Sequence, residues 1–141
     1  MPGVQHKDQD KPTLLEVVLR VQGDFRRRLA PLQVTSLQAG VMLYLKRHPD
    51  AKMKDTAAAL SVQPPTLTAV IDDLVRKLWM TRRRALHDDR ALCLRLSRQG
   101  QVLARKITDH VRHVSAEAAN KDRPVAGLTR LHSDPTKIKE E

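Results

Sequence analysis

Aromatic residues are scarce in this chain of 141 residues, which contains one Phe, one Tyr and one Trp. Proteins that bind RNA or single-stranded DNA usually stack several bases on aromatic side chains. The scarcity therefore argues against those partners. If the chain binds nucleic acid at all, the composition favours duplex DNA.

Cysteine and recognisable catalytic motifs are also nearly absent. Cys93 is the only cysteine, so no disulfide can form within the chain and a reducing cytoplasm is expected. The five glycines are scattered, and no phosphate loop, nucleophile elbow or metalloprotease motif appears. We therefore expect no enzyme activity and no cofactor. The polar N-terminus does not resemble a signal peptide, and no apolar run is long enough to span a bilayer.

Basic residues are abundant by comparison. Lys and Arg number 26 against 16 for Asp and Glu, which gives a formal net charge of +10. Such a balance favours a polyanionic partner, either nucleic acid or an anionic membrane surface. Because the basic residues gather around one short segment, nucleic acid is the better interpretation.

That segment runs from Ser61 to Arg90. Residues 63–78 are predicted to form one amphipathic helix, with Pro64 and Pro65 in its first turn, where a missing N–H costs little. Its predicted buried stripe is Leu67, Val70, Ile71, Leu74 and Leu78. Its opposite face carries the small or polar residues Gln63, Thr66, Thr68 and Ala69.

A basic hairpin is predicted directly after this helix. Three consecutive arginines, 82–84, lie on one arm, while Leu92, Leu94 and Leu96 alternate along the other as in a half-buried strand. A recognition helix beside an arginine-rich hairpin is typical of a winged helix-turn-helix. The expected fold class is therefore mainly α with a small β-hairpin wing, and with dimerisation helices at both ends.

The flanking segments complete the predicted layout. Residues 1–11 are expected to be a disordered arm, 12–34 a first dimerisation helix with a linker, and 35–97 the winged helix-turn-helix lobe. Residues 98–120 are expected to be a long dimerisation helix, and 121–141 a polar tail with room for one short helix.

Two further helices are predicted within the lobe. The first begins with a capping box at Thr35-Ser36-Leu37-Gln38 and ends at Pro49. Its expected stripe is Leu37, Val41, Tyr44, Leu45 and His48. Residues 51–60 are expected to form a short alanine-rich helix, and 61–63 the tight turn before the recognition helix.

The long last helix points to a second copy of the chain. A helix over residues 98–119 would be roughly 33 Å long, which is more than the small lobe can cover. We expect an interface between two copies that contains Leu15, Val18, Leu103, Ile107, Val111 and Val114.

The order of these elements resembles the MarR (multiple antibiotic resistance regulator) family of winged-helix transcription factors, over residues 14–120. The residues that carry the resemblance are T-S-L-Q at 35–38, H-P at 48–49, A-A-A-L-S-V at 57–62, P-P-T-L-T at 64–68 and D-D-R-A-L-C-L-R-L-S-R-Q-G at 88–100. The last run is similar to the family's wing signature and is the most specific of them.

The resemblance implies a homodimer whose recognition helices enter successive major grooves of a palindromic operator. By position, Arg90 would enter the minor groove, with Asp88 orienting it. The expected DNA-contacting residues are Thr35, Ser36, Gln63, Pro65, Thr66, Thr68, Ala69, Arg82, Arg83, Arg84, Asp88 and Arg90.

The implied function is that of a prokaryotic, cytoplasmic, nucleoid-associated transcriptional regulator, a repressor relieved by a small aromatic or phenolic effector. Chemistry alone suggests Phe25, Tyr44, His48 and Arg112 as effector-binding residues. The sequence gives neither the operator nor the effector.

Three departures from the family pattern keep other interpretations open. Leu78 and Trp79 stand where the family often has glycine, which predicts an extension of the helix, and Ala69 replaces a frequent arginine. The chain after the long helix is also short. An unregulated architectural DNA-binding protein is therefore the alternative, whereas the wing arginines argue against a protein-interaction module that has lost DNA binding.

Two smaller patterns suggest chemistry less strongly. His110 and His113 lie three residues apart beside Asp109, a spacing that can serve a metal, although surface histidines are the commoner case. Cys93 on the wing strand is expected to be inert unless Arg95 lowers its pKa.

Overall fold

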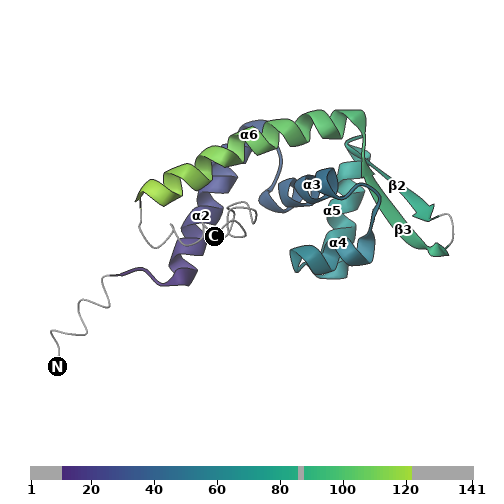
Figure 1. Cartoon of the computed structure of the whole chain (residues 1–141), viewed down its shortest axis with the longest axis horizontal. Coiled ribbons are helices and arrows are strands. Elements are labelled where there is room, and N and C mark those ends of the chain that lie inside the picture. The colour runs from purple at the N-terminus through teal and green to yellow at the C-terminus, as the bar shows by residue number, and fades with distance from the viewer. Residues whose placement is uncertain (1–10, 86–87, 122–141) are drawn as a thin grey trace, which may run out of the picture. The chain divides into compact units, whose positions relative to one another are not determined.

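The computed structural model describes residues 11–85 and 88–121, and the chain divides into two compact units (Figure 1). One unit is Met1–Arg28 with Val111–Glu141, and the other is Leu29–His110. In the part of the chain that is described, no helix combines the length and apolar character that a membrane crossing would need.

The first unit contains α2 (Leu14–Leu29), which begins two residues after the predicted start. Thr13 and Glu16 form a capping box, because each side chain binds the backbone N–H of the other residue. Val17 is buried, but three leucines of the same helix are open to solvent. Leu14, Leu15 and Leu19 are 68%, 67% and 57% exposed.

The second unit begins with a short 3-10 turn, η1 (Ala30–Leu32), and continues with α3 (Ser36–Arg47). The predicted capping box is confirmed: the Thr35 hydroxyl accepts from Gln38 N–H at 3.1 Å, and the Gln38 side chain accepts from Thr35 N–H. The Gln38 amide nitrogen also donates to Asp73, which ties the start of α3 to the next-but-one helix. Of the predicted stripe, Val41 and Leu45 are buried, whereas His48 is exposed and caps the end of α3.

Helices α4 (Met53–Leu60) and α5 (Pro64–Arg76) form the helix-turn-helix. The expectation that residues 51–60 are all helical is wrong, because Ala51–Lys52 form a short strand, β1. Asp50, with a φ of 63°, turns the chain so that β1 can pair with the free edge of the hairpin.

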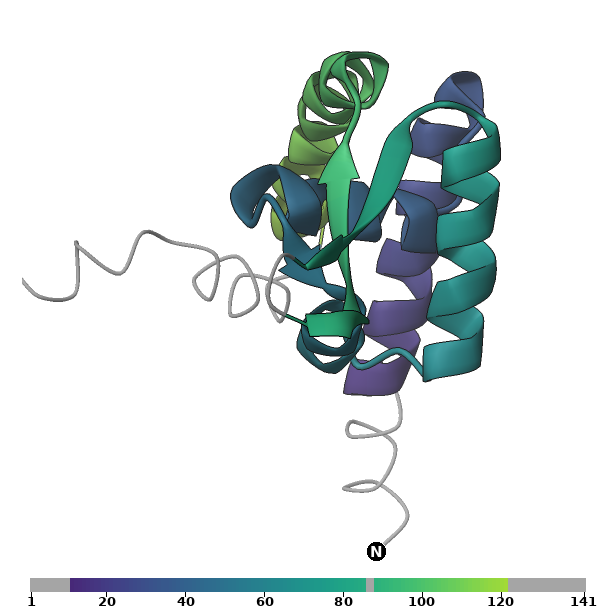
Figure 2. The same cartoon turned by 90° about the vertical axis from the view of Figure 1, so that its right-hand side faces the viewer.

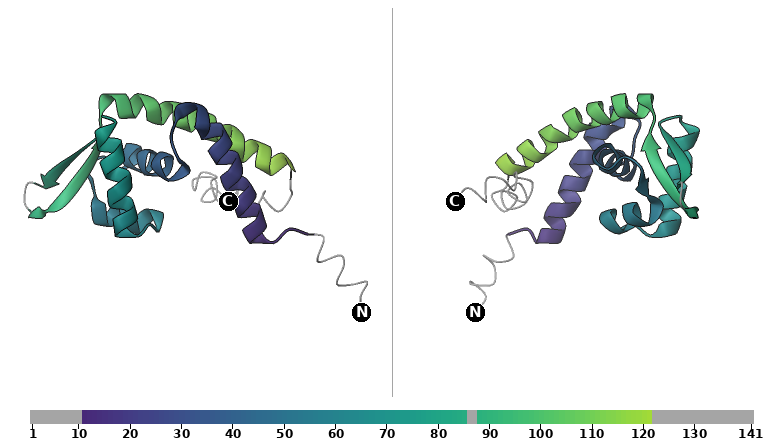
Figure 3. Two further views of the ribbon diagram at one scale, coloured as in Figure 1. Left: turned by 180° about the vertical axis from the view of Figure 1, so that it is seen from behind. Right: turned by 45° about the vertical axis from the view of Figure 1, so that its right-hand side comes forward.

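The predicted hairpin is present as β2 (Met80–Ala85) and β3 (Asp88–Leu96), in an antiparallel sheet of order β1-β3-β2. The left view of Figure 3 shows the hairpin extending beyond α5, and Figure 2 shows the short connection from α5 into β2. Leu94 and Leu96 are buried and Leu92 is 36% exposed, so the alternation holds towards the base of the wing. After Ser97 the chain enters α6 (Arg98–Lys121), and its residues 98–110 belong to this unit. The predicted tail lies outside the described residues from 122 onwards.

The core of the second unit contains residues from every helix and from the hairpin. The buried apolar side chains are Leu29, Val34, Ala39, Val41, Met42, Leu45, Ala57, Leu67, Ile71, Leu74, Met80, Leu94, Leu96, Ala104 and Ile107. Buried Thr56 satisfies its hydroxyl on the Lys52 carbonyl at 2.9 Å.

The prediction that Leu78 belongs to the buried stripe of α5 is wrong. The helix ends at Arg76, and Leu78 has a φ of 65° and is 68% exposed. Leu78 N–H bonds to the Val75 carbonyl and Trp79 N–H to the Leu74 carbonyl, both at 3.0 Å. This pair of bonds is a Schellman motif with Leu78 at the position where glycine is usual. The chain therefore makes a tight turn here without a glycine, and the predicted extension of the helix does not occur.

Candidate nucleic-acid interface

The turn between α4 and α5 aims the start of α5 away from the core. Ser61, with a φ of 53°, occupies a second left-handed turn, in which Val62 N–H bonds to the Ala57 carbonyl at 2.9 Å. Ala57 is buried, and its small side chain lets the two helices pack closely. As predicted, residues 61–63 form a tight turn, and α5 starts at Pro64.

The first half of α5 exposes the predicted reading face. Gln63, Pro65, Thr66, Thr68 and Ala69 are all exposed. Gln63 is the N-cap but makes no capping bond through its side chain, so its amide groups face solvent. The Thr68 hydroxyl donates to the Pro64 carbonyl at 3.0 Å, which leaves the oxygen as an acceptor. In the second unit, Thr35 and Ser36 at the start of α3 are also exposed.

The three arginines of β2 are all exposed, but they differ in their ion pairs. Arg82 stands opposite Leu94 and forms an ion pair with Asp72 of α5. Arg83 stands opposite Cys93, and neither Arg83 nor Arg84 has an ion-pair partner among the described residues. Arg82 therefore joins the wing to α5, while Arg83 and Arg84 are exposed cations on the same strand.

Residues 86–87 at the turn of the wing lie outside the described residues, and residues 85 and 88–90 beside it are described only in their backbone. Asp88 opens β3 and pairs with Ala85, next to a register shift between Arg84 and Ala85. Arg90 follows in the same strand. The side chains of Asp88 and Arg90 lie outside the described part of the chain, so their roles in the minor groove stay predictions.

The base of the wing is fixed to the turn after α5. The Ser97 hydroxyl donates to the Leu78 carbonyl at 2.7 Å and accepts from Gly100 N–H at 3.0 Å, and Ser97 N–H bonds to the Trp79 carbonyl. A Cβ atom at Gly100 would lie 1.9 Å from the Trp79 oxygen. This contact leaves no room for a side chain at position 100.

An ion pair joins the middle of the sheet to the turn before β1. The Arg95 guanidinium donates two hydrogen bonds to the Asp50 carboxylate, one of them at 2.9 Å. These bonds lower the pKa of Asp50 and raise the pKa of Arg95. Sequence reasoning missed this pair because Asp50 and Arg95 are 45 positions apart. Arg95 is thus engaged by a carboxylate, while Cys93 is a half-buried free thiol.

The four residues suggested for an effector divide between the two units. Phe25 and Arg112 belong to the first, whereas Tyr44 and His48 belong to the second. Tyr44 and His48 lie one turn apart on α3, with ring centroids 4.4 Å apart. A joint effector site for the four residues stays a prediction.

Of the predicted histidine pair, only the side chain of His110 lies among the described residues. His110 Nδ1 lies 2.8 Å from the Lys106 carbonyl within α6, and the side chain of His113 is outside the described set. Over the residues that can be searched, no group of three or more His, Cys, Asp or Glu side chains is arranged to hold a metal ion.

The residues expected at an interface between two copies differ in exposure. Leu15 is open to solvent, and Val18, Leu103 and Val111 are half-buried. Ile107 and Val114 are fully buried within the single chain. A charge at Ile107 would therefore disturb the protomer itself, so α2 offers the cleaner test of association.

Comparisons with known proteins agree with the winged helix-turn-helix described above. The model of the family described as transcriptional regulator SarA/Rot matches residues 28–107, which is more than half of the chain. No protein of curated function matches in sequence.

Several solved structures share the fold. A mutant of MarR from E. coli complexed with operator DNA is 24% identical, covers 82% of this chain and 84% of its own, and has a TM-score of 0.73. The transcriptional repressor CouR, bound to a 23-mer DNA duplex, is 27% identical over 84% of this chain and 86% of its own, with a TM-score of 0.74. BpsR from Bordetella bronchiseptica, solved for the regulation of its DNA binding by 6-hydroxynicotinic acid, is 17% identical over 86% of this chain and 96% of its own, with a TM-score of 0.73.

Proposed function

The chain belongs to the SarA/Rot family of transcriptional regulators, and from this premise we propose that it acts as a homodimer on a palindromic operator. It is a DNA-binding transcriptional regulator with the winged-helix fold of MarR repressors, and its family is one of regulators rather than enzymes. The proposal adds that it reads sequence, represses in the cytoplasm at the nucleoid, and is released by a small aromatic or phenolic effector.

The exposed first half of α5, beside an arginine-bearing strand, is the observation that carries the proposal. A glutamine amide can pair with an adenine edge in the major groove, and the Thr68 oxygen can accept from an exocyclic amine. Arg83 and Arg84 supply charge for phosphates, which position a protein on DNA without reading sequence. One unit of the molecule thus carries the residues that we propose for both kinds of contact.

The structural relatives support the DNA and effector parts of this proposal. A MarR protein and CouR have both been seen on DNA, and BpsR is described with a small carboxylic acid that regulates its DNA binding. Release by an effector would be a shift between two populations, in which the ligand favours a spacing of recognition helices unlike the ~34 Å helical repeat of DNA.

An architectural DNA-coating function is the second candidate. Ala69 is exposed in the middle of the reading face and offers no hydrogen bond to a base. A protein of that kind would bind mainly through phosphates and distinguish poorly between sequences.

A DNA-binding titration of Gln63→Ala distinguishes the two functions. The affinity is measured for a selected palindrome and for a scrambled duplex at one salt concentration. Loss of a base contact should cost about 1–3 kcal/mol, or roughly 5- to 150-fold in Kd, on the palindrome and much less on the scrambled duplex. Gln99→Ala, an exposed glutamine at the start of α6, serves as control and should change neither. An equal loss on both duplexes would replace the regulator by the architectural protein.

A further inference from the structure

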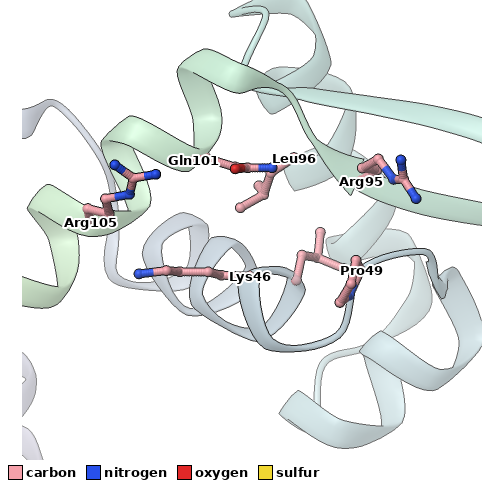
Figure 4. Close-up of a pocket in the computed structure, with 7 residues that line it drawn as sticks. Lys46, Pro49, Arg95, Leu96, Gln101 and Arg105 are labelled. Atoms are coloured by element: carbon pink, nitrogen blue, oxygen red, sulfur yellow. The ribbon is translucent and has the colours of Figure 1, made fainter.

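A small basic pocket lies within the second unit, at the base of the wing (Figure 4). It has a volume of about 220 Å³ and is formed by the end of α3, the end of β3 and the first turns of α6. The residues that line it are Leu45, Lys46, Pro49, Arg95, Leu96, Gln101 and Arg105.

Two of its cations lack a counter-charge. Lys46 and Arg105 are exposed, and within the described ranges neither forms an ion pair. In Figure 4 the Lys46 ammonium and the Arg105 guanidinium lie on the same side of the pocket, and the Arg95 side chain lies at the other end. Arg95 is bound to Asp50, so this carboxylate neutralises Arg95 rather than the other two cations. Two like charges on one depression create a positive potential that an anion would relieve.

The rest of the lining fits a compact ligand with an apolar part. Gln101 brings an amide that can donate to an oxygen, and Figure 4 shows it between Arg105 and Leu96. Leu45 and Leu96 are 1% and 5% exposed and supply an apolar floor. The volume equals that of about seven water molecules, which is less than a drug-sized ligand needs.

The pocket lies at the base of the wing, whereas the residues proposed to enter DNA lie at the wing tip and at the start of α5. The nearest proposed phosphate contact is Arg83, which pairs with Cys93, two positions before Arg95 of the pocket lining. β3 runs nine residues from Asp88 at the tip to Leu96 in the pocket, which is roughly 26 Å at ~3.3 Å per residue. None of the lining residues belongs to α5. Operator phosphates at the tip and at the start of α5 would therefore not reach Lys46 and Arg105, and the salt titration below tests whether a phosphate near Arg83 does.

We propose that this pocket binds one small anion with a carboxylate or phosphate group, held by Lys46 and Arg105 and oriented by Gln101. A bound anion would connect α3, the end of β3 and α6 at the point where the wing continues into the long helix. The site shares no residue with the effector residues suggested by the sequence, and it does not depend on DNA binding.

Isothermal titration of the full chain with inorganic phosphate, and separately with benzoate, at constant ionic strength tests the proposal. Binding of at least one probe should saturate at one molecule per chain. Binding of phosphate alone would identify a phosphate site, and binding of benzoate alone would identify a carboxylate site. Binding of both would show that the pocket recognises the negative charge that the two probes share. Lys46→Met and Arg105→Met should each weaken the bound probe at least about tenfold, because each removes a charged hydrogen-bond donor.

The neighbouring cations provide matched controls. Arg47→Met and Lys106→Met remove one charge each from the same helices but lie outside the pocket lining, so they should change the affinity less than about twofold. All four side chains are exposed, so folding should survive, and melting curves would check it. If a methionine variant did not fold, the glutamine variant at the same position would replace it.

Absence of saturable binding by both probes would overturn the proposal. Equal weakening of probe binding by the pocket and control variants would also overturn it, because this would indicate attraction by the net charge alone. Weakening of probe binding by only one of the two pocket variants would overturn it as well. A reduced salt dependence of DNA binding in Lys46→Met or Arg105→Met without probe would reassign these cations to DNA phosphates.

Discussion

Leu78 holds a left-handed backbone conformation that costs a residue with a Cβ roughly 1–2 kcal/mol. Its side chain is 68% exposed and so recovers little of this cost by burial. The structure tolerates the strain because the two Schellman bonds and the Ser97 hydroxyl hold the turn. At position 78 the backbone conformation is therefore strained, while the side chain contributes little burial.

Leu78→Gly should consequently stabilise the protein. Relief of strain exceeds the larger conformational entropy that glycine gives the unfolded chain, so the free energy of unfolding should rise by about 0.5–1 kcal/mol. Urea denaturation measures the change. Ala69→Gly, at an exposed helical position of α5, should lower the same free energy by about 1 kcal/mol. A loss of stability in Leu78→Gly would show that the leucine makes contacts worth more than the strain.

A salt titration of DNA binding should show whether Arg83 of the wing contacts a phosphate. Arg83→Ala should make the slope of log affinity against log salt shallower by about 0.9, the value for one phosphate contact. The loss should be similar on any duplex, because Arg83 is exposed and a phosphate contact carries no sequence information. Binding of the variant is compared at five or more salt concentrations with that of Arg76→Ala, an exposed arginine at the far end of α5. An unchanged slope for Arg83→Ala would remove β2 from the phosphate-binding surface.

At the scale of elements, two glycines in helices have opposite structural roles. Gly100 in α6 faces the Trp79 backbone, whereas a Cβ at Gly40 in α3 would have no heavy atom within 4 Å. Gly100→Ala must push apart the wing base and α6, so we expect a loss of at least about 1–3 kcal/mol in unfolding free energy. Gly40→Ala should instead gain up to about 1 kcal/mol from helix propensity. Thermal and urea unfolding of both variants give the comparison, and a stable Gly100→Ala would mean that the contact relaxes easily.

The elements that could be predicted from sequence are those specified by neighbouring residues. The Thr35–Gln38 capping box, the turn at 61–63 and the two arms of the hairpin depend on spacings of a few positions, and all are present. Strand β1 could not be predicted, because two residues adopt it only through pairing with Leu94 and Cys93 more than 40 positions away. The end of α5 was misplaced because leucine is a good helix former and its left-handed turn is held by later residues.

The candidate interface, like the fold, could be predicted from sequence only where it depends on neighbouring residues. The polar face of α5 follows from helical periodicity, and its predicted members are exposed. The pairing of Arg82 with Asp72 does not follow from periodicity, because it joins a strand to a helix across a turn whose geometry the sequence does not give. The burial of Ile107 likewise depends on packing and not on its place in an apolar stripe.

At the scale of the whole molecule, the exposed apolar face of α2 supports the proposed dimer. Leu14, Leu15 and Leu19 stay open to solvent in the single chain, although the helix they belong to is well capped. Burial of a leucine contributes about 1.5–3 kcal/mol, and a two-fold interface counts each residue twice. A second copy of the chain is the partner that the proposed palindromic operator would also require.

Leu15→Asp should therefore dissociate the proposed dimer without unfolding the protomer, since position 15 is already 67% exposed. Light scattering should report about 32 kDa for the parent chain, twice its 16.0 kDa, and 16.0 kDa for the variant at the same concentration. Loss of two buried leucines and burial of two charges should weaken the dimer at least about 100-fold. Affinity for a palindrome should fall with it, because the second half-site loses its effective concentration. Leu78→Asp makes the same change at an equally exposed leucine of the other unit and should stay dimeric. A parent chain of 16.0 kDa would refute the dimer, and a dimeric Leu15→Asp would move the interface away from this face of α2.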